Sequence, residues 1–221
     1  MIAEEMWPSI STRDTVKMLA FVALAVLTWS GLRGADSARA AEAANLLSYC
    51  SSCHGPDGRS PSSLFPSLAG QQKNYIVAQL RNFRDGTRTA PHGQTFLDYL
   101  VMWGVVSRLD PPTVDAIAAF YATQTPLPGE PAGSPEIVTS GRKIYTEGIP
   151  SKSVPACISC HGVRAEGNGP IPRLAGQYQA YLARQLQAFA SWARQSVTMH
   201  ANSENLTSQQ ISEVTAYLAT L

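Results

Sequence analysis

The sequence carries little charge of either sign. Charged residues make up 15% of its 221 residues, and the formal net charge at pH 7 is only +1. Proteins that bind nucleic acids or anionic membranes electrostatically usually present a basic stripe or cluster. The composition therefore gives no support for a nucleic-acid-binding protein or for a polybasic membrane surface.

The apolar run near the start of the chain is too short to cross a membrane. It extends from Met18 to Trp29, which is 12 residues, whereas a spanning helix needs about 20. Arg13 and Lys17 precede the run, and the small-residue segment 38–40 (ARA) follows it, which is the order of a secretory signal peptide and its cleavage site. We therefore expect residues 1–40 to be a signal peptide that exports the protein to the periplasm, with an uncleaved anchor as the alternative.

Cysteine is scarce, and its spacing is informative. The four cysteines occur as CSSCH at residues 50–54 and CISCH at residues 157–161. Two disulfides are the first expectation for four cysteines in an exported chain. However, Cys-x-x-Cys-His is the attachment signature of c-type haem, in which two thiols form thioethers to one porphyrin and the histidine becomes the proximal iron ligand. The sequence thus predicts two haems, attached through Cys50, Cys53, Cys157 and Cys160 and ligated by His54 and His161.

The same spacing has two other interpretations. A redox dithiol of the thioredoxin type would need a βαβ context, which the sequence does not show. A zinc site would need another close Cys/His pair in each half, where the first half offers only His92 and the second only His200.

The chain contains an internal duplication, which supports the haem interpretation. The segment 66–71 (PSLAGQ) returns as 172–177 (PRLAGQ), at an offset of 106 residues that is kept through Phe83 and Phe189. At the cysteine motifs the offset is 107 residues. Two tandem copies of one unit follow from this pattern. Between the PxLAGQ segment and the shared phenylalanine, the copies also have in common Tyr75 and Tyr181, Gln79 and Gln185, and Leu80 and Leu186.

Each copy is predicted to end in a helix, and the two copies are separated by a proline-rich segment. Asp110 before Pro111 predicts a helix that runs to Ala122. Residues 207–210 (TSQQ) resemble a capping box before a helix with one apolar face. Segment 125–135 holds four prolines in eleven residues, so we expect a semi-rigid extended linker. The predicted organisation is a first haem domain at 41–125, a linker at 126–135 and a second haem domain at 136–221.

Two methionines are the predicted sixth ligands of the irons. Met102 lies seven residues before Leu109, and Met199 lies seven residues before Leu206, although the loops before them differ in length. A thioether ligand favours reduced iron. His92 and His200 are the alternatives, each of which is otherwise interpreted as an exposed loop histidine.

These motifs resemble the class I cytochrome c family, and in tandem form cytochrome c4, over about residues 41–221. The resemblance implies that the carbonyls of Pro66 and Pro172 accept hydrogen bonds from the proximal histidines. It also implies a crossing of the first and last helices of each domain. In the second domain, Gly141 and Tyr145 would meet Val214 and Tyr217; in the first, Ala43 and Leu47 are weaker matches.

The second copy departs from the family pattern around its methionine. Residues 201–205 (ANSEN) are polar where related chains often carry apolar residues or glycine, and the stretch 190–198 is shorter than its counterpart. Both differences bear on how firmly Met199 would be held.

Without a period-two alternation of useful length, we predict an all-α protein of two tandem class I cytochrome c-like domains, each wrapped around one covalently bound haem. Two His/Met haems, with no evident acid–base or nucleophilic residues, favour an electron carrier over an enzyme. Its partners would be redox proteins such as a quinol-oxidising complex, a terminal oxidase or a dehydrogenase, with peripheral membrane association a further option. The alternative is the cytochrome subunit of a dehydrogenase complex, such as a sulfide-oxidising flavocytochrome. A third interpretation, a di-haem peroxidase or thiosulfate-oxidising cytochrome, needs an open or unusually ligated iron.

Overall fold

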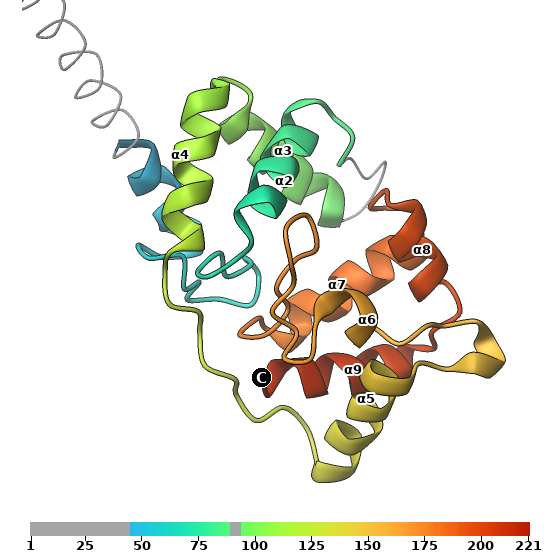
Figure 1. Ribbon diagram of the computed structural model, residues 1–221. Coiled ribbons are helices and arrows are strands. Elements are labelled where there is room, and N and C mark those ends of the chain that lie inside the picture. Colours follow the sequence, from blue (N-terminus) through green and yellow to red (C-terminus); the bar gives the residue numbers. More distant parts are fainter. Residues whose placement is uncertain (1–44, 89–93) are drawn as a thin grey trace, which may run out of the picture. The chain divides into compact units, whose positions relative to one another are not determined.

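The computed structural model describes residues 45–88 and 94–221, without the side chains of residues 94–98. This part of the chain is helical, with two isolated β-bridges and no strand (Figure 1). The predicted all-α class is therefore confirmed. None of the helices described is long and apolar enough to cross a membrane.

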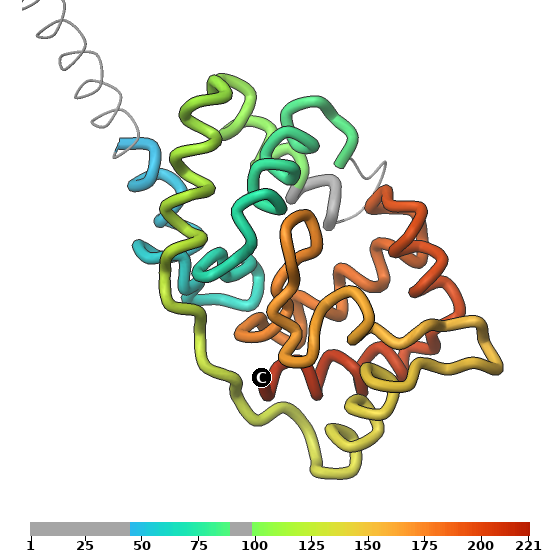
Figure 2. The backbone as a smooth tube through the Cα atoms, in the orientation of Figure 1, coloured from blue at the N-terminus to red at the C-terminus, as the bar shows by residue number. Residues whose placement is uncertain are grey.

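The helices follow the duplication seen in the sequence. In the first half, residues 45–54 are helical, followed by α2 (Lys73–Arg84), α3 (Gln94–Val106) and α4 (Pro111–Ala122). The second half contains α5 (Pro135–Glu147), a 3₁₀ turn (Pro150–Lys152), α6 (Ile158–His161), α7 (Gln179–Ala190), α8 (Val197–Ser203) and α9 (Ser208–Ala219). Residues 46–221 form one compact unit that contains both halves (Figure 2).

The two predicted terminal helices begin where their capping residues indicate. The Asp110 side chain accepts a hydrogen bond from the Thr113 backbone N–H at 2.9 Å. At the start of α9, the Thr207 hydroxyl accepts from the Gln210 N–H at 3.2 Å, and the Gln210 side chain accepts from the Thr207 N–H at 3.0 Å. These reciprocal bonds satisfy backbone donors that a helix leaves without internal partners.

Each half has its own apolar core. In the first half, α4 contributes Val114, Ile117 and Tyr121, which pack with Ile76 and Phe83 of α2. In the second half, α5 and α9 meet in a core whose buried members are Ile144, Tyr145, Ala165, Ala175, Leu182, Val214 and Leu218. A core of this size gives a domain only marginal stability. A large apolar group enclosed in each half would add buried apolar surface and so stabilise it.

The predicted crossing of the first and last helices is confirmed in the second half. A Cβ on Gly141 would lie 1.9 Å from the Glu213 carbonyl oxygen of α9, so only glycine lets the two backbones approach this closely. The rings of Tyr145 and Tyr217 pack beside this point, with centroids 5.5 Å apart. In the first half, Ala43 lies outside the described residues, and Leu47 packs against the first core.

Substitution of Gly141 tests this crossing. We expect Gly141→Ala to destabilise the protein by about 3 kcal/mol, because α5 and α9 must separate to admit the methyl group. Gly104→Ala is the matched control, since no described heavy atom lies within 4 Å of a Cβ at this helical glycine; there alanine should stabilise by roughly 0.5–1 kcal/mol. Thermal unfolding of the three proteins measures both effects, and equal melting temperatures would contradict the crossing.

The proline-rich segment packs along the second half instead of standing free. The Glu130 N–H donates a hydrogen bond to the Ala219 carbonyl at 2.7 Å. A Cβ on Gly129 would lie 2.2 Å from the Thr220 carbonyl oxygen, so the backbone of the segment runs directly against the end of the chain. Helix α5 starts at Pro135, the last residue of the predicted linker.

Candidate haem sites

Each Cys-x-x-Cys-His motif occupies one turn of helix. In the second half the His161 N–H donates to the Cys157 carbonyl at 3.0 Å, which closes the turn. Positions i, i+3 and i+4 share one face of a helix, so Cys157, Cys160 and His161 face the same side. The first motif is helical in the same way, through residue 54. The two residues between the cysteines therefore bring both thiols and the imidazole to one side of the turn, as attachment to a single porphyrin requires.

A glycine then reverses the chain after each motif. Gly55 and Gly162 have φ values of +81° and +86°, in the left-handed region that glycine tolerates. A Cβ on Gly55 would also lie 2.2 Å from the Arg59 carbonyl oxygen. The reversal brings the following loop back over the histidine that has just been placed.

That loop fixes both histidine rings. His54 Nδ1 lies 2.8 Å from the Pro66 carbonyl oxygen, and His161 Nδ1 lies 3.0 Å from the Pro172 carbonyl oxygen, as the resemblance implies. Because a carbonyl can only accept, each Nδ1 carries the proton and each Nε2 keeps its lone pair for a metal. Burial lowers the pKa of both histidines, which favours the neutral, metal-binding form.

None of the four cysteines forms a disulfide, and burial disfavours the reactive thiolate of one cysteine in each motif. Burial raises the pKa of Cys50, and it raises the pKa of Cys157 to about 11. Redox dithiols depend on a lowered thiol pKa, so this environment argues against the thioredoxin-like alternative. Among residues 45–88 and 94–221, no three His, Cys, Asp or Glu side chains gather into a metal-binding group, which leaves the zinc alternative without a site there.

The two predicted methionine ligands lie on helices. Met102 of α3 is half-buried and packs against the first core, which Cys50 also contacts. Met199 of α8 is half-buried, and its N–H donates to the Ser196 hydroxyl at 3.2 Å. The Ser203 hydroxyl in turn donates to the Met199 carbonyl at 2.6 Å. The polar residues after Met199 therefore continue a helix and brace the methionine's backbone. Sulfur–iron ligation itself stays a prediction.

The interpretation of His200 as an exposed loop residue is wrong. The residue belongs to α8 and is half-buried. Its Nδ1 lies 2.9 Å from the Phe189 carbonyl oxygen, its Nε2 lies 3.0 Å from a Glu204 carboxylate oxygen, and the ring packs on Trp192 at 4.1 Å between centroids. With both ring nitrogens engaged, His200 is a poor candidate for the sixth ligand. His92 lies outside the described residues.

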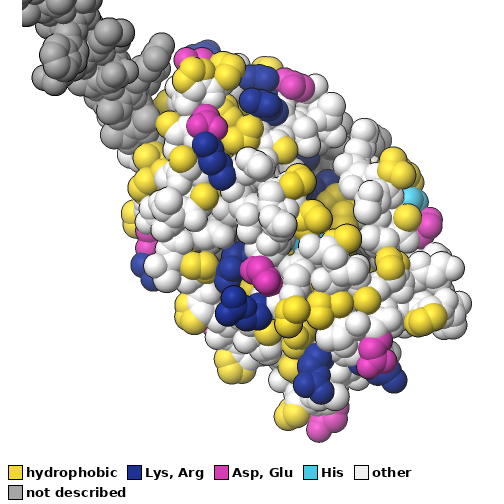
Figure 3. All heavy atoms as spheres, in the orientation of Figure 1, with side chains coloured by type: hydrophobic (Ala, Val, Ile, Leu, Met, Phe, Trp, Pro, Cys, Tyr) yellow, Lys and Arg dark blue, Asp and Glu magenta, His cyan; other side chains and the backbone are white. Residues whose placement is uncertain are grey.

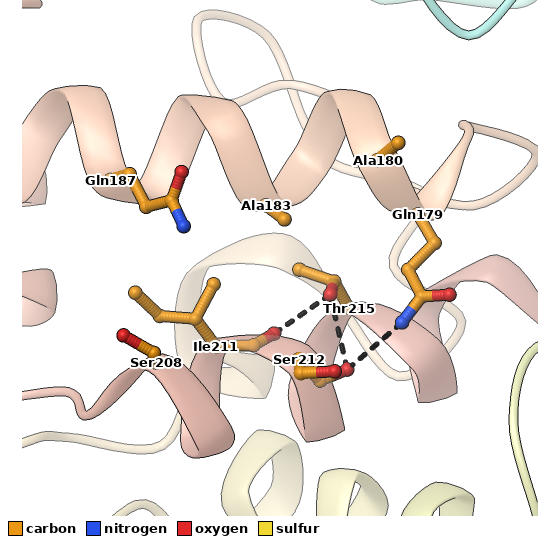
Figure 4. Close-up of a pocket in the computed structure, with 8 residues that line it drawn as sticks. All are labelled: Gln179, Ala180, Ala183, Gln187, Ser208, Ile211, Ser212 and Thr215. Carbon is orange, nitrogen blue, oxygen red and sulfur yellow. Dashed lines mark hydrogen bonds between the residues drawn. The ribbon is translucent and has the colours of Figure 1, made fainter.

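The cavity drawn in Figure 4 is separate from these motifs. It measures about 200 Å³ and lies between α7 and α9, where the Gln179 side chain donates to the Ser212 carbonyl at 3.2 Å. It is lined by Gln179, Ala180, Ala183, Gln187, Ser208, Ile211, Ser212 and Thr215, none of which belongs to a haem motif.

The repeated glutamines form a contact between the halves that the sequence did not predict. The Gln71 side chain donates to the Arg173 carbonyl at 2.9 Å and accepts from the Arg173 N–H at 2.7 Å. Gln177 makes the same pair of bonds with Ser67, at 3.1 and 3.0 Å. Since Ser67 and Arg173 are equivalent positions, the halves meet through matching surfaces. The sequence signal for this contact was the glutamine that both copies carry at the same position, Gln71 and Gln177.

Comparison with known proteins agrees with the geometry. The cytochrome c family model matches residues 138–221. Cytochrome c4 of Azotobacter vinelandii is 33% identical over 186 residues, covering 81% of this chain and 87% of the relative. A thiosulfate dehydrogenase electron acceptor of Thiomonas intermedia is 34% identical over 203 residues, covering 89% of each chain.

A solved structure extends the likeness to the fold. The structure of Acidithiobacillus ferrooxidans cytochrome c4 matches with a TM-score of 0.70 and 36% identity, covering 79% of this chain and 99% of that one. The free thiols and the neutral imidazoles found here fit covalent haem attachment as in such proteins. The chain therefore belongs to the cytochrome c4 family, and it is an electron-carrying c-type cytochrome.

Proposed function

We propose that the protein binds two c-type haems, one in each half. The observation that carries this is the repeated helical turn, in which both histidines hold Nδ1 against a proline carbonyl. When bound, each haem supplies a one-electron iron couple that no amino-acid side chain here could replace. Attachment would use Cys50, Cys53, Cys157 and Cys160, with His54 and His161 as proximal ligands and Met102 and Met199 as sixth ligands.

The protein's own groups tune such a site. The Pro66 and Pro172 carbonyls orient the imidazole rings and increase their basicity as ligands. Met102 and Met199, as sixth ligands, would favour the reduced state and would close each iron to other ligands. A closed iron supports electron transfer instead of substrate chemistry, so we propose a carrier and not an enzyme.

A haem count tests this proposal. The pyridine haemochrome assay should give two haems per chain, and extraction with acidified organic solvent should leave both on the polypeptide, because thioethers survive denaturation. One haem per chain, or haem that partitions into the solvent, would refute the proposed cofactor content.

We propose that the partners are redox proteins outside the cytoplasm. On the face drawn in Figure 3, basic and acidic side chains are interspersed instead of segregated by sign, and the net charge is +1. Steering by a strong field of one sign therefore has little support. The signal-like segment 1–40, whose structure is not described, supports export to the periplasm.

The electron donor could be a dehydrogenase instead of a quinol-oxidising complex. The Thiomonas intermedia relative is named as an electron acceptor of thiosulfate dehydrogenase, which favours a dehydrogenase as donor over a quinol-oxidising complex. Retention of a dehydrogenase during purification from the native host would support this alternative.

A further inference from the structure

The turn after α7 carries a tryptophan where the first copy has a glycine. Gly86 and Trp192 are equivalent at the 106-residue offset, and each lies two residues beyond the end of its helix, α2 or α7. Both have left-handed backbone, with φ values of +73° and +57°. In each copy the backbone N–H two positions further on donates to the carbonyl six residues before it, at 3.0 Å and 2.9 Å. The two turns therefore share one shape, and only the second carries a bulky side chain there.

This position strains the backbone of Trp192. Left-handed backbone brings Cβ close to the following carbonyl oxygen, a cost that glycine avoids. The turn does not require tryptophan, since Gly86 forms the same turn in the first copy. The side chain is not needed as a core residue either, because 45% of Trp192 is exposed. Strained residues persist where the surrounding structure holds them for another purpose, so the contact of the ring is informative.

The Trp192 ring packs on His200 of α8. The two ring centroids lie 4.1 Å apart, and the ring planes meet at 30°. Both nitrogens of the same imidazole are also held, Nδ1 2.9 Å from the Phe189 carbonyl oxygen at the end of α7 and Nε2 3.0 Å from a Glu204 carboxylate oxygen. The imidazole is thus fixed at two nitrogens and by a stacked ring, and it directly follows Met199. We call Trp192 and His200 the aromatic clasp.

Helix α8 is anchored differently from α3, its counterpart in the first copy. It has seven residues, and a helix this short does not persist without tertiary contacts. Among the described residues, the second core and the apolar side chains packed against it include none from α8. Instead α8 packs on α7 (Figure 1). Helix α3 has 13 residues, and its contributions to the first core are Tyr99, Met102, Val105 and Val106.

We propose that the aromatic clasp positions Met199. Trp192 fixes His200, His200 fixes α8 against the end of α7, and α8 presents the methionine sulfur to the second iron. This inference rests on the proposed haem content and on Met199 as a sixth ligand. It makes Trp192 a positioning residue that sets how easily another ligand displaces Met199. The first copy has no such clasp, because Gly86 lacks a side chain and Met102 is followed by a tryptophan instead of a histidine.

The test titrates the ferric protein with imidazole, which displaces methionine from each iron. The NMR resonances of the two ligand methyl groups follow the two displacements separately, and Met199→Ala identifies the resonance of the second haem. In Trp192→Gly the new glycine fits the turn but leaves His200 without the stacked ring. We expect the imidazole concentration that displaces half of Met199 to fall about fivefold, the order expected for one aromatic pair. The displacement of Met102 should not change.

Two variants test whether the rings act together. Trp192→Phe keeps an aromatic ring against His200, so Met199 should stay nearly as difficult to displace as in the wild type. His200→Ala removes the other ring, and it should weaken the hold on Met199 at least as much as Trp192→Gly does. Adding Trp192→Gly to His200→Ala should then change little, because the contact has already been lost.

Trp103→Ala is the matched control. Trp103 directly follows Met102 in the chain, as His200 follows Met199, and it is exposed to the same 45% as Trp192. It belongs to the other copy and takes no part in the clasp, so its loss should leave the displacement of Met199 unchanged.

Three results would overturn the proposal while two haems are bound. These are an unchanged displacement of Met199 in Trp192→Gly, an equal fall for both methionines, or the same fall in Trp103→Ala. A haemochrome count below two, or a Met199→Ala protein that keeps both methyl resonances, would instead refute the cofactor content or the ligand on which the clasp depends. If Trp192→Gly does not fold, Trp192→Asn replaces it, since asparagine also tolerates left-handed backbone.

Discussion

Cys50→Ala combined with Cys53→Ala is expected to remove one haem and leave the first half largely unfolded. The first core is small, with its buried members supplied by α2, α4, the end of α3 and Leu109. Large apolar groups in a core contribute several kcal/mol, roughly 3–5 for one aromatic side chain, and a porphyrin is larger. Domains of this size often depend on a covalent or metal-centred support.

The haemochrome count should fall from two to one per chain, and circular dichroism should show about half of the helix signal lost. Limited proteolysis should cut within residues 45–122 and leave the segment 135–221 resistant. Ser52→Ala is the control in the same helical turn, because the Ser52 hydroxyl donates only to the nearby Tyr49 carbonyl and, weakly, to Cys53. A fully helical, protease-resistant double variant would show that the first half folds without haem.

Met199→Ala is expected to open the second iron to other ligands and to lower its reduction potential by more than about 59 mV. For one electron this shift changes the ratio of reduced to oxidised haem tenfold. Loss of the thioether removes the ligand that favours reduced iron. The ferric sulfur-to-iron absorption of that haem should disappear, and added imidazole should bind. Met199→His should also lower the potential while keeping the iron closed. Met102→Ala should likewise lower the potential of the first haem and remove its sulfur-to-iron absorption.

His200→Ala is the matched control for Met199. His200 contacts Phe189, Glu204 and Trp192, so its loss should cost about 1 kcal/mol of stability and leave the sulfur-to-iron band in place. The opposite pattern, with Met199→Ala silent and His200→Ala shifting both spectrum and potential, would identify His200 as the ligand.

The two sites are connected by more than the chain between them. Bonds from Gln71, Gln177 and Arg194 join the two copies. The sequence predicted a semi-rigid extended linker between the two haem domains. The structure adds a direct interface, so the linker is one of two elements that hold the halves together.

Local and repeated features could be predicted from the sequence by itself. The Cys-x-x-Cys-His turn, the cap at Asp110 and the capping box at Thr207 depend on residues within four positions of one another, and such short-range chemistry can be read directly. The duplication then marked the positions that both copies share. The histidine–proline bonds and the Gly141 crossing came from the resemblance to a family, since neither can be derived from spacing.

Only the tertiary structure decided the surroundings of His200 and of Arg194. His200 is held by a carbonyl eleven residues away and by a tryptophan, and Arg194 bonds to side chains 115 and 119 residues away. The contacts of His200 depend on how α8 packs against the end of α7, and those of Arg194 depend on how the two halves dock. No periodicity along the chain records either arrangement. The sequence determined which groups the protein carries, whereas packing within and between the two copies determined which of them share an environment.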